Sequence, residues 1–95
     1  LEFDTATYSI RREGKNIAVT ATGRKILETL MRNTHRVVAK SEIEQVIWGD
    51  DPPRSDSLKI HIHTLREVID KPFSSALIII VRGVGYRIVE AHETL

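Results

Sequence analysis

The chain has 95 residues, of which 41% are hydrophobic and 28% charged, as in an ordinary globular domain with a single core. It contains no cysteine, which excludes disulfide bonds and thiolate metal sites. No apolar run approaches the roughly 20 residues that cross a membrane and no signal peptide opens the sequence, so we expect no membrane contact from this segment. The absence of cysteine fits a reducing cytoplasm, and because the first residue is Leu1 rather than methionine, we expect a piece of a longer protein.

Positive charge is concentrated in one part of the chain, although the net charge is only +1. Residues 1–53 contain eight basic and eight acidic side chains, which cancel. Residues 54–87 contain six Lys and Arg against three acids, and the tail that follows adds two glutamates. Nucleic-acid binding depends on such a local excess more than on net charge, so residues 54–87 are the candidate region for it.

The first 20 residues predict a small antiparallel sheet with one solvent-exposed face. Its β-favouring runs are residues 1–3, 8–12 and 16–20, with a hairpin turn at Glu13-Gly14-Lys15. Three basic side chains, Arg11, Arg12 and Lys15, are expected on the exposed face, and we assign them no function.

Two helices are predicted next. The first begins at Thr20 or Thr22, whose hydroxyls can cap free amides, and ends at Arg32-Asn33. Its core positions, at helical spacing, are Ile26, Leu27, Leu30 and Met31, while Gly23 weakens its first turn. After a short strand or extended link at 37–39, Ser41 and Glu44 form a Ser-x-x-Glu capping box that starts the second helix. Its inner face is predicted as Ile43, Val46 and Ile47, and Trp48 ends it as a core residue.

The third helix follows a Pro-containing loop, 49–53, and runs from Ser55 or Ser57 to Asp70, before Pro72. At about 100° per residue, one narrow buried arc holds Leu58, Ile62, Leu65 and Ile69. The opposite face holds Lys59, Ile60, His63, Thr64 and Glu67, with Arg66 on its flank. A lone exposed isoleucine is common on any surface, but on a helix in a DNA major groove it could pack on a thymine methyl group.

The chain closes with a predicted β-hairpin. Residues 76–81 form an apolar strand, 82–85 a turn with two glycines, and 86–89 the return strand, before a frayed polar end. The order of elements predicts an α+β winged helix-turn-helix, made of an N-terminal sheet (1–20), a helical layer (21–71) and a wing hairpin (76–90), in one domain spanning residues 1–95.

Four groups of residues, taken in order, resemble a known family. They are Val19-Thr20-Ala21-Thr22 with Ile26-Leu27; Val37-Val38 with Ser41 and Val46-Ile47-Trp48-Gly49; Ser57-Leu58, His61-Ile62 and Leu65-Arg66; and Val81-Arg82-Gly83-Val84-Gly85-Tyr86-Arg87. In this order and at these spacings, the chain resembles the C-terminal effector domain of OmpR/PhoB-type response regulators over nearly all of its length.

The resemblance implies a bacterial, cytoplasmic transcription factor at the end of a two-component phosphorelay. It implies that helix 55–70 lies in the major groove and that the hairpin wing touches the minor groove through Arg82. Ile60 and Thr64 match base-contact positions, whereas His61, His63 and Arg66 match phosphate-contact positions. Lys59 then becomes a phosphate or guanine contact. The loop with Asp50, Asp51 and Arg54 matches the segment that meets RNA polymerase. The resemblance also implies that the protein binds direct repeats as a dimer and that the isolated domain is a monomer without DNA. It implies no cofactor.

The chain departs from the family pattern at several positions. Gly23 replaces a usual glutamate, Asp56 an arginine, Lys59 an aspartate and Ile80 a threonine. These changes leave the fold intact, but the DNA sequence that is read need not follow that of any relative.

Other interpretations of these residues remain open. Arg66 could pair with Asp70, Arg87 with Glu90, and the loop acids could be only solvated. His61 could pack against the core, and because it lies two residues from His63, about 200° around a helix, the two cannot share a metal. No Ser, His or acid has the local signature of a catalytic nucleophile, so we expect no enzyme. The alternatives to a response regulator are a winged helix that binds proteins and the cytoplasmic DNA-binding domain of a membrane-anchored regulator.

Overall fold

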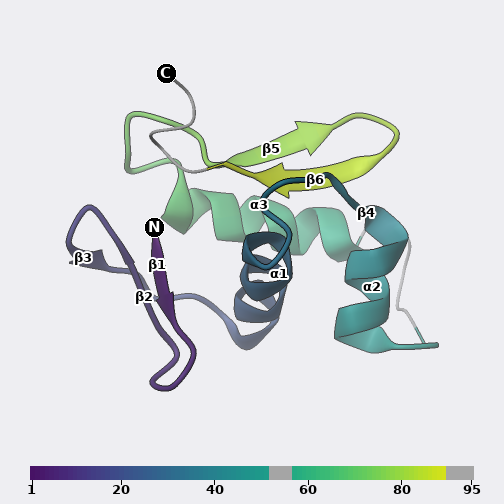
Figure 1. Cartoon of the computed structure of the whole chain (residues 1–95), viewed down its shortest axis with the longest axis horizontal. Coiled ribbons are helices and arrows are strands. Elements are labelled where there is room, and N and C mark those ends of the chain that lie inside the picture. Colours follow the sequence, from purple (N-terminus) through teal and green to yellow (C-terminus); the bar gives the residue numbers. More distant parts are fainter. Residues whose placement is uncertain (52–56, 90–95) are drawn as a thin grey trace.

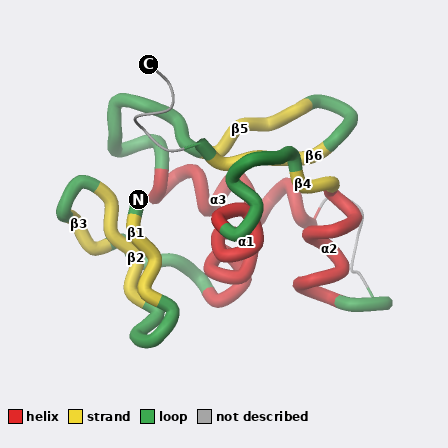
Figure 2. The backbone as a smooth tube through the Cα atoms, viewed as in Figure 1, coloured by secondary structure: helices red, strands yellow, loops and turns green. Residues whose placement is uncertain are grey.

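The computed structural model describes residues 1–51 and 57–89, and it has the predicted order of elements (Figure 1). The strands are β1 (Glu2–Asp4), β2 (Ser9–Arg12), β3 (Lys15–Asn16), β4 (Val38–Ala39), β5 (Ile78–Val81) and β6 (Gly85–Ile88). The helices are α1 (Ala21–Met31), α2 (Lys40–Trp48) and α3 (Ser57–Ile69). Figure 2 shows the N-terminal sheet at one end of the helical layer and the wing sheet along another side, which is the predicted winged-helix arrangement with an added N-terminal sheet.

The N-terminal sheet is antiparallel, as predicted, with strand order β1-β2-β3. Phe3 pairs with Ile10 and Arg11 with Asn16. The third strand is shorter than expected, because β3 stops at Asn16 and residues 17–20 lie outside a strand. Residues 17–19 therefore form a link between the sheet and Thr20, which precedes α1.

Arg12 is the main correction to the predicted sheet. It is only 2% exposed, whereas Arg11 and Lys15 are exposed as predicted. Side chains alternate along a strand, so Arg12 shares the inward face with Ile10. Its guanidinium is satisfied there: it donates to the Ile69 carbonyl and, at 2.7 and 2.8 Å, to the carbonyl and hydroxyl oxygens of Ser75. The arginine thus ties β2 to the C-terminal end of α3.

Of the two predicted caps, Thr20 begins α1. Its hydroxyl accepts a hydrogen bond of 3.0 Å from the amide of Gly23. A Cβ on residue 23 would lie 2.8 Å from Val19 Cγ1 and 3.1 Å from the capping hydroxyl of Thr20. The glycine that weakens the first turn therefore makes room for Val19 and for the capping threonine.

We expect Thr20→Ala to lower the free energy of unfolding by about 1 kcal/mol, because the mutation leaves a helix-terminal amide without its acceptor. Chemical denaturation followed by circular dichroism measures the change. Thr20→Ser keeps the hydroxyl and is the control, expected to stay close to wild type. Equal losses for the two variants would contradict a capping role.

Helix α2 begins two residues earlier than predicted, at Lys40, with Ala39 rather than Ser41 in the capping position. Ser41 therefore lies inside the helix, and the predicted Ser41–Glu44 capping box is wrong. Instead Glu42 accepts from the Ala39 amide at 3.4 Å and pairs with Arg36 at 2.8 Å. The early start follows from β4, whose pairing with β6 fixes the chain up to Ala39. The Arg36 guanidinium, by its hydrogen bonds, holds the pKa of the Glu42 carboxyl below its usual value.

The inner face of α2 is narrower than predicted. Ile43 is fully buried and Ile47 and Trp48 pack partly against the core, but Val46 is 54% exposed. On the helix, Val46 lies about 60° to one side of Ile43 and Ile47 lies to the other side. Because α2 is short and lies at the edge of the core, the core covers only the side with Ile47. The prediction for Val46 is therefore wrong.

The wing sheet has strand order β4-β6-β5, so the short strand between the first two helices pairs with the C-terminal hairpin. Ile78 pairs with Ile88 and Val81 with Gly85, and Gly83 takes the positive φ of 75° that the turn requires. The core beneath the sheet consists mainly of Ile26, Leu27, Leu30, Val38, Ile43, Leu58, Ile62, Leu65, Ile69, Leu77, Ile78 and Ile88. Among the described residues, no helix is long and apolar enough to cross a membrane.

Candidate nucleic-acid interface

Helix α3 has the two faces predicted for it. Leu58, Ile62, Leu65 and Ile69 are all buried. On the opposite side Lys59, His63 and Thr64 are exposed, and Ile60 is 59% exposed. The hydroxyl of Thr64 donates to the Ile60 carbonyl at 3.1 Å, which leaves its oxygen free to accept from a ligand. This helix therefore presents a mixed polar and apolar surface to solvent.

The two histidines of α3 have different surroundings. His61 is partly buried, and its ring centroid lies 5.9 Å from that of Trp48, so it packs α3 against α2. His63 is exposed, with Nε2 3.4 Å from a carboxylate oxygen of Glu67. Within residues 1–51 and 57–89, no three His, Asp or Glu side chains gather as a possible metal site.

A groove of about 340 Å³ lies between α3 and the wing. The residues that line it are Lys40, Lys59, Ile80, Val81, Arg82, Gly83, Val84, Gly85 and Tyr86. Lys59 from α3 and the exposed Arg82 from the wing, which are far apart in sequence, therefore border one surface depression. Its lining combines apolar residues of the wing with basic side chains, and basic side chains bind the phosphates of DNA.

Of the residues that line this groove, only Lys59 and Arg82 were among the predicted contacts. Lys40 stands at the start of α2, and its amide donates to the Val84 carbonyl at 3.3 Å, so the wing tip lies beside that helix end. Burial, together with the negative charge of Glu44, raises the pKa of the Tyr86 hydroxyl, which stays a neutral donor. Ile80 is 51% exposed. The β4–β6 pairing brings Lys40 beside the wing strand that contains Tyr86, and no local sequence pattern contains that pairing.

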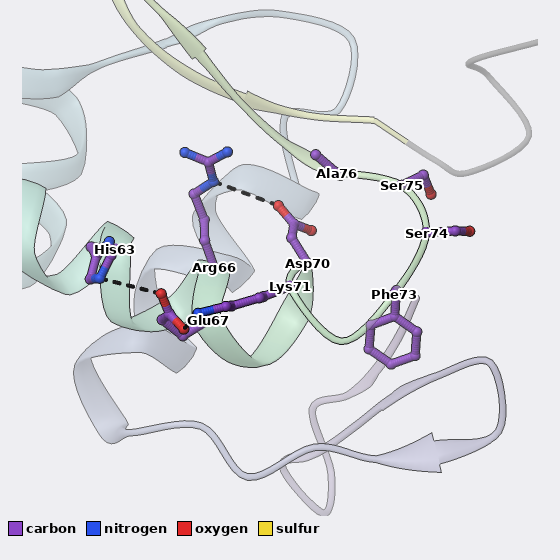
Figure 3. A pocket seen from close by; sticks show the side chains of 9 residues that line it. All are labelled: His63, Arg66, Glu67, Asp70, Lys71, Phe73, Ser74, Ser75 and Ala76. Carbon is purple, nitrogen blue, oxygen red and sulfur yellow. Dashed lines mark ion pairs between the residues drawn. The ribbon is translucent and has the colours of Figure 1, made fainter.

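Arg66 borders a second depression, of about 410 Å³, at the C-terminal end of α3 (Figure 3). Its lining residues are His63, Arg66, Glu67, Asp70, Lys71, Phe73, Ser74, Ser75 and Ala76. Arg66 Nε lies 3.7 Å from Asp70 Oδ2, the pair that the spacing predicts. Asp70 itself is only 8% exposed, so the pair is partly buried rather than a free surface pair.

Of the remaining predicted residues, the structure describes only some. Asp50 and Asp51 are exposed after α2, with Gln45 donating to Asp50 at 3.3 Å. Arg54 and Asp56 lie outside the described residues, as do the predicted start of the third helix at Ser55 and the partner proposed for Arg87, Glu90. The Nε of Arg87 is buried without a hydrogen-bond partner in the described part of the chain.

Comparison with known proteins identifies the family. Residues 14–88 match the model of the family described as "Transcriptional regulatory protein, C terminal". The response regulator MprA of Mycobacterium sp. (strain KMS) is 37% identical over 87 residues, which cover 90% of this chain. Those residues make up 38% of the mycobacterial protein, so the chain spans well under half the length of that relative.

Solved structures agree with this match. The DNA-binding domain of the response regulator AdeR, in complex with an intercistronic region, superposes with a TM-score of 0.81 and 27% identity over 94% of this chain and 92% of that domain. DrrB from Thermotoga maritima, an OmpR/PhoB homologue, superposes with a TM-score of 0.80 and 25% identity over 93% of this chain and 41% of its own. The chain therefore belongs to the family of C-terminal domains of transcriptional regulatory proteins, the DNA-binding output domains of OmpR/PhoB-type response regulators.

Proposed function

We propose that the chain binds duplex DNA sequence-specifically, with α3 in the major groove and Arg82 of the wing in the adjacent minor groove. The observation that carries the proposal is the shared groove of Lys59 and Arg82 beside the exposed face of α3. A duplex whose backbone enters this groove brings both basic side chains to its phosphates or bases. The complex of the related AdeR domain with an intercistronic region supports DNA as the ligand.

The exposed side chains divide by chemistry into two roles. Ile60 and Thr64 suit base edges, because a methyl-bearing side chain packs on thymine and a hydroxyl exchanges hydrogen bonds with either type of base. Lys59, Arg66 and His63 suit phosphates, which fix the register of the protein on DNA without reading its sequence. His61 can offer only a ring nitrogen to a phosphate, because its ring packs against Trp48. A narrow A·T-rich minor groove attracts Arg82 through its negative potential.

A salt titration tests the phosphate role of Lys59. We expect Lys59→Gln to make the slope of log affinity against log salt less steep by about 0.9, the value for one lost phosphate contact on duplex DNA. Lys15→Gln is the matched control, because Lys15 is also exposed but lies on β3, outside the wing groove. Fluorescence anisotropy with a labelled duplex measures both slopes. An unchanged slope for Lys59→Gln would remove this residue from the interface.

The parent protein, in our proposal, is a cytoplasmic bacterial response regulator that controls transcription without enzymatic activity in this domain. The domain would bind direct repeats as a dimer and contact RNA polymerase through Asp50, Asp51 and Arg54. The mycobacterial relative, a response regulator more than twice as long as this chain, supports the assignment. The full-length sequence distinguishes it from the alternative, a membrane-anchored regulator: a receiver domain supports the first and a membrane-spanning segment the second.

A further inference from the structure

We propose that Asp70 is a positioning residue for DNA binding: it holds Arg66 through Nε so that the guanidinium faces a DNA phosphate, and Arg12 fixes Asp70 in turn. The inference rests on the DNA-binding function proposed above. It connects the N-terminal sheet, which lies away from the wing in Figure 1, to the outer face of α3.

Asp70 is fixed first by the start of β5. The residue directly follows α3 and is 8% exposed. Its Oδ1 accepts from the Leu77 amide at 2.8 Å and its Oδ2 from the Ile78 amide at 3.2 Å. Because β5 is an edge strand, its amides need acceptors from outside the sheet, and the carboxylate supplies them. The end of α3 is thereby locked to the wing sheet.

Arg12 fixes the carboxylate from the other side. Its Nη1 lies 3.4 Å from Asp70 Oδ1, and the same guanidinium donates to Ile69 and Ser75 and stacks 4.5 Å from the ring centroid of Phe73. A planar fork with five donors satisfies all of these partners at once, which a lysine cannot do. The position of Asp70 therefore depends on the N-terminal sheet as well as on β5.

Arg66 is oriented by this fixed carboxylate. It lies one helical turn before Asp70, and its Nε is 3.7 Å from Oδ2, buried and without a hydrogen-bond partner in the described residues. In Figure 3 the dashed line of the ion pair joins Asp70 to Nε, and the two terminal nitrogens take no part in it. One carboxylate faces two guanidinium groups, so a positive charge remains. The pair therefore orients Arg66 without neutralising the charge that a phosphate would bind.

Three possible roles for Asp70 predict different effects of an Asp70 mutation on DNA affinity. If the aspartate acts only through its negative charge, removing that charge tightens binding to any duplex, because DNA repels it. If it only stabilises the fold, the mutation weakens binding equally whether or not Arg66 is present. A positioning residue weakens binding only when Arg66 is there to be positioned.

A double-mutant cycle separates these roles. Wild type, Asp70→Asn, Arg66→Ala and the double mutant are titrated with a duplex that wild type selects from a random pool, after circular dichroism has shown that each is folded. We expect Asp70→Asn to weaken binding about fivefold to tenfold with Arg66 present and less than about twofold in the Arg66→Ala background. Equal weakening in both backgrounds, or tighter binding, would overturn the inference. If wild type selects no duplex, the proposed function itself fails.

A second measurement needs neither DNA nor a variant. Nuclear magnetic resonance of the wild-type chain reports the exchange rate of each arginine Nε–H. We expect exchange at Arg66 to be about tenfold or more slower than at the exposed Arg11, because burial and the nearby carboxylate restrict opening. Equal rates would mean that Asp70 does not hold Arg66 in solution, even if the chain binds DNA.

Discussion

Gly85→Ala lowers the free energy of unfolding by about 3 kcal/mol, the upper part of the range for overpacking, because the added methyl group has no space. A Cβ on residue 85 would lie 2.0 Å from the Val38 carbonyl oxygen and 2.9 Å from Ala39 Cα. Both atoms belong to the backbone of β4, which cannot move aside by rotating a side chain. The β4–β6 pairing must separate, and with it the contact between the wing and α2. Urea denaturation followed by circular dichroism measures the loss.

The control for this variant is Gly83→Ala, in the same hairpin. Gly83 has a φ of 75° and no atom within 4 Å of an added Cβ. An alanine at position 83 is therefore destabilised only by the strain of the left-handed backbone conformation, which lowers the free energy of unfolding by about 1 kcal/mol. If Gly85→Ala loses no more stability than Gly83→Ala, the close approach of β4 and β6 is absent in solution.

Leu58→Ala lowers the free energy of unfolding by about 2 to 5 kcal/mol, whereas Ile60→Ala changes it by less than about 0.5 kcal/mol. The two residues lie two positions apart on α3, one fully buried and the other 59% exposed. Truncating the first leaves a cavity in the core, while truncating the second removes a side chain that already contacts water. Thermal or urea unfolding of both variants measures the difference. Comparable losses of stability for the two variants would show that α3 does not direct Leu58 toward the core and Ile60 toward solvent.

The helical layer could be predicted because its pattern is local. The buried arc of α3 follows from the spacing of Leu58, Ile62, Leu65 and Ile69, and the structure confirms each of them as core. The wing hairpin was equally predictable, since a strongly apolar run and a turn with two glycines lie side by side in the sequence. The positions of α3 outside this buried arc are then expected to be exposed, and the candidate base contacts are among them.

What the sequence could not predict depends on partners far along the chain. Arg12 looked like a surface residue because its acceptors, at positions 69 and 75, are more than 50 residues away. The capping box was misplaced because the pairing of β4 with β6, not a serine, sets the start of α2. The Lys40 side of the wing groove was missed for the same reason. The predictions from local patterns are thus wrong where contacts between residues far apart in the sequence determine the structure.

Selection of duplexes from a random pool tests the central claim, that the outer face of α3 reads DNA sequence, most directly. Wild type, Ile60→Ala and the control Val46→Ala, which alters an exposed apolar residue on α2, are each used to enrich bound sequences. We predict that wild type and Val46→Ala enrich one common motif and that Ile60→Ala loses the preference for thymine at one position of it. Enrichment of the same complete motif by Ile60→Ala, or of no motif by wild type, would contradict the claim.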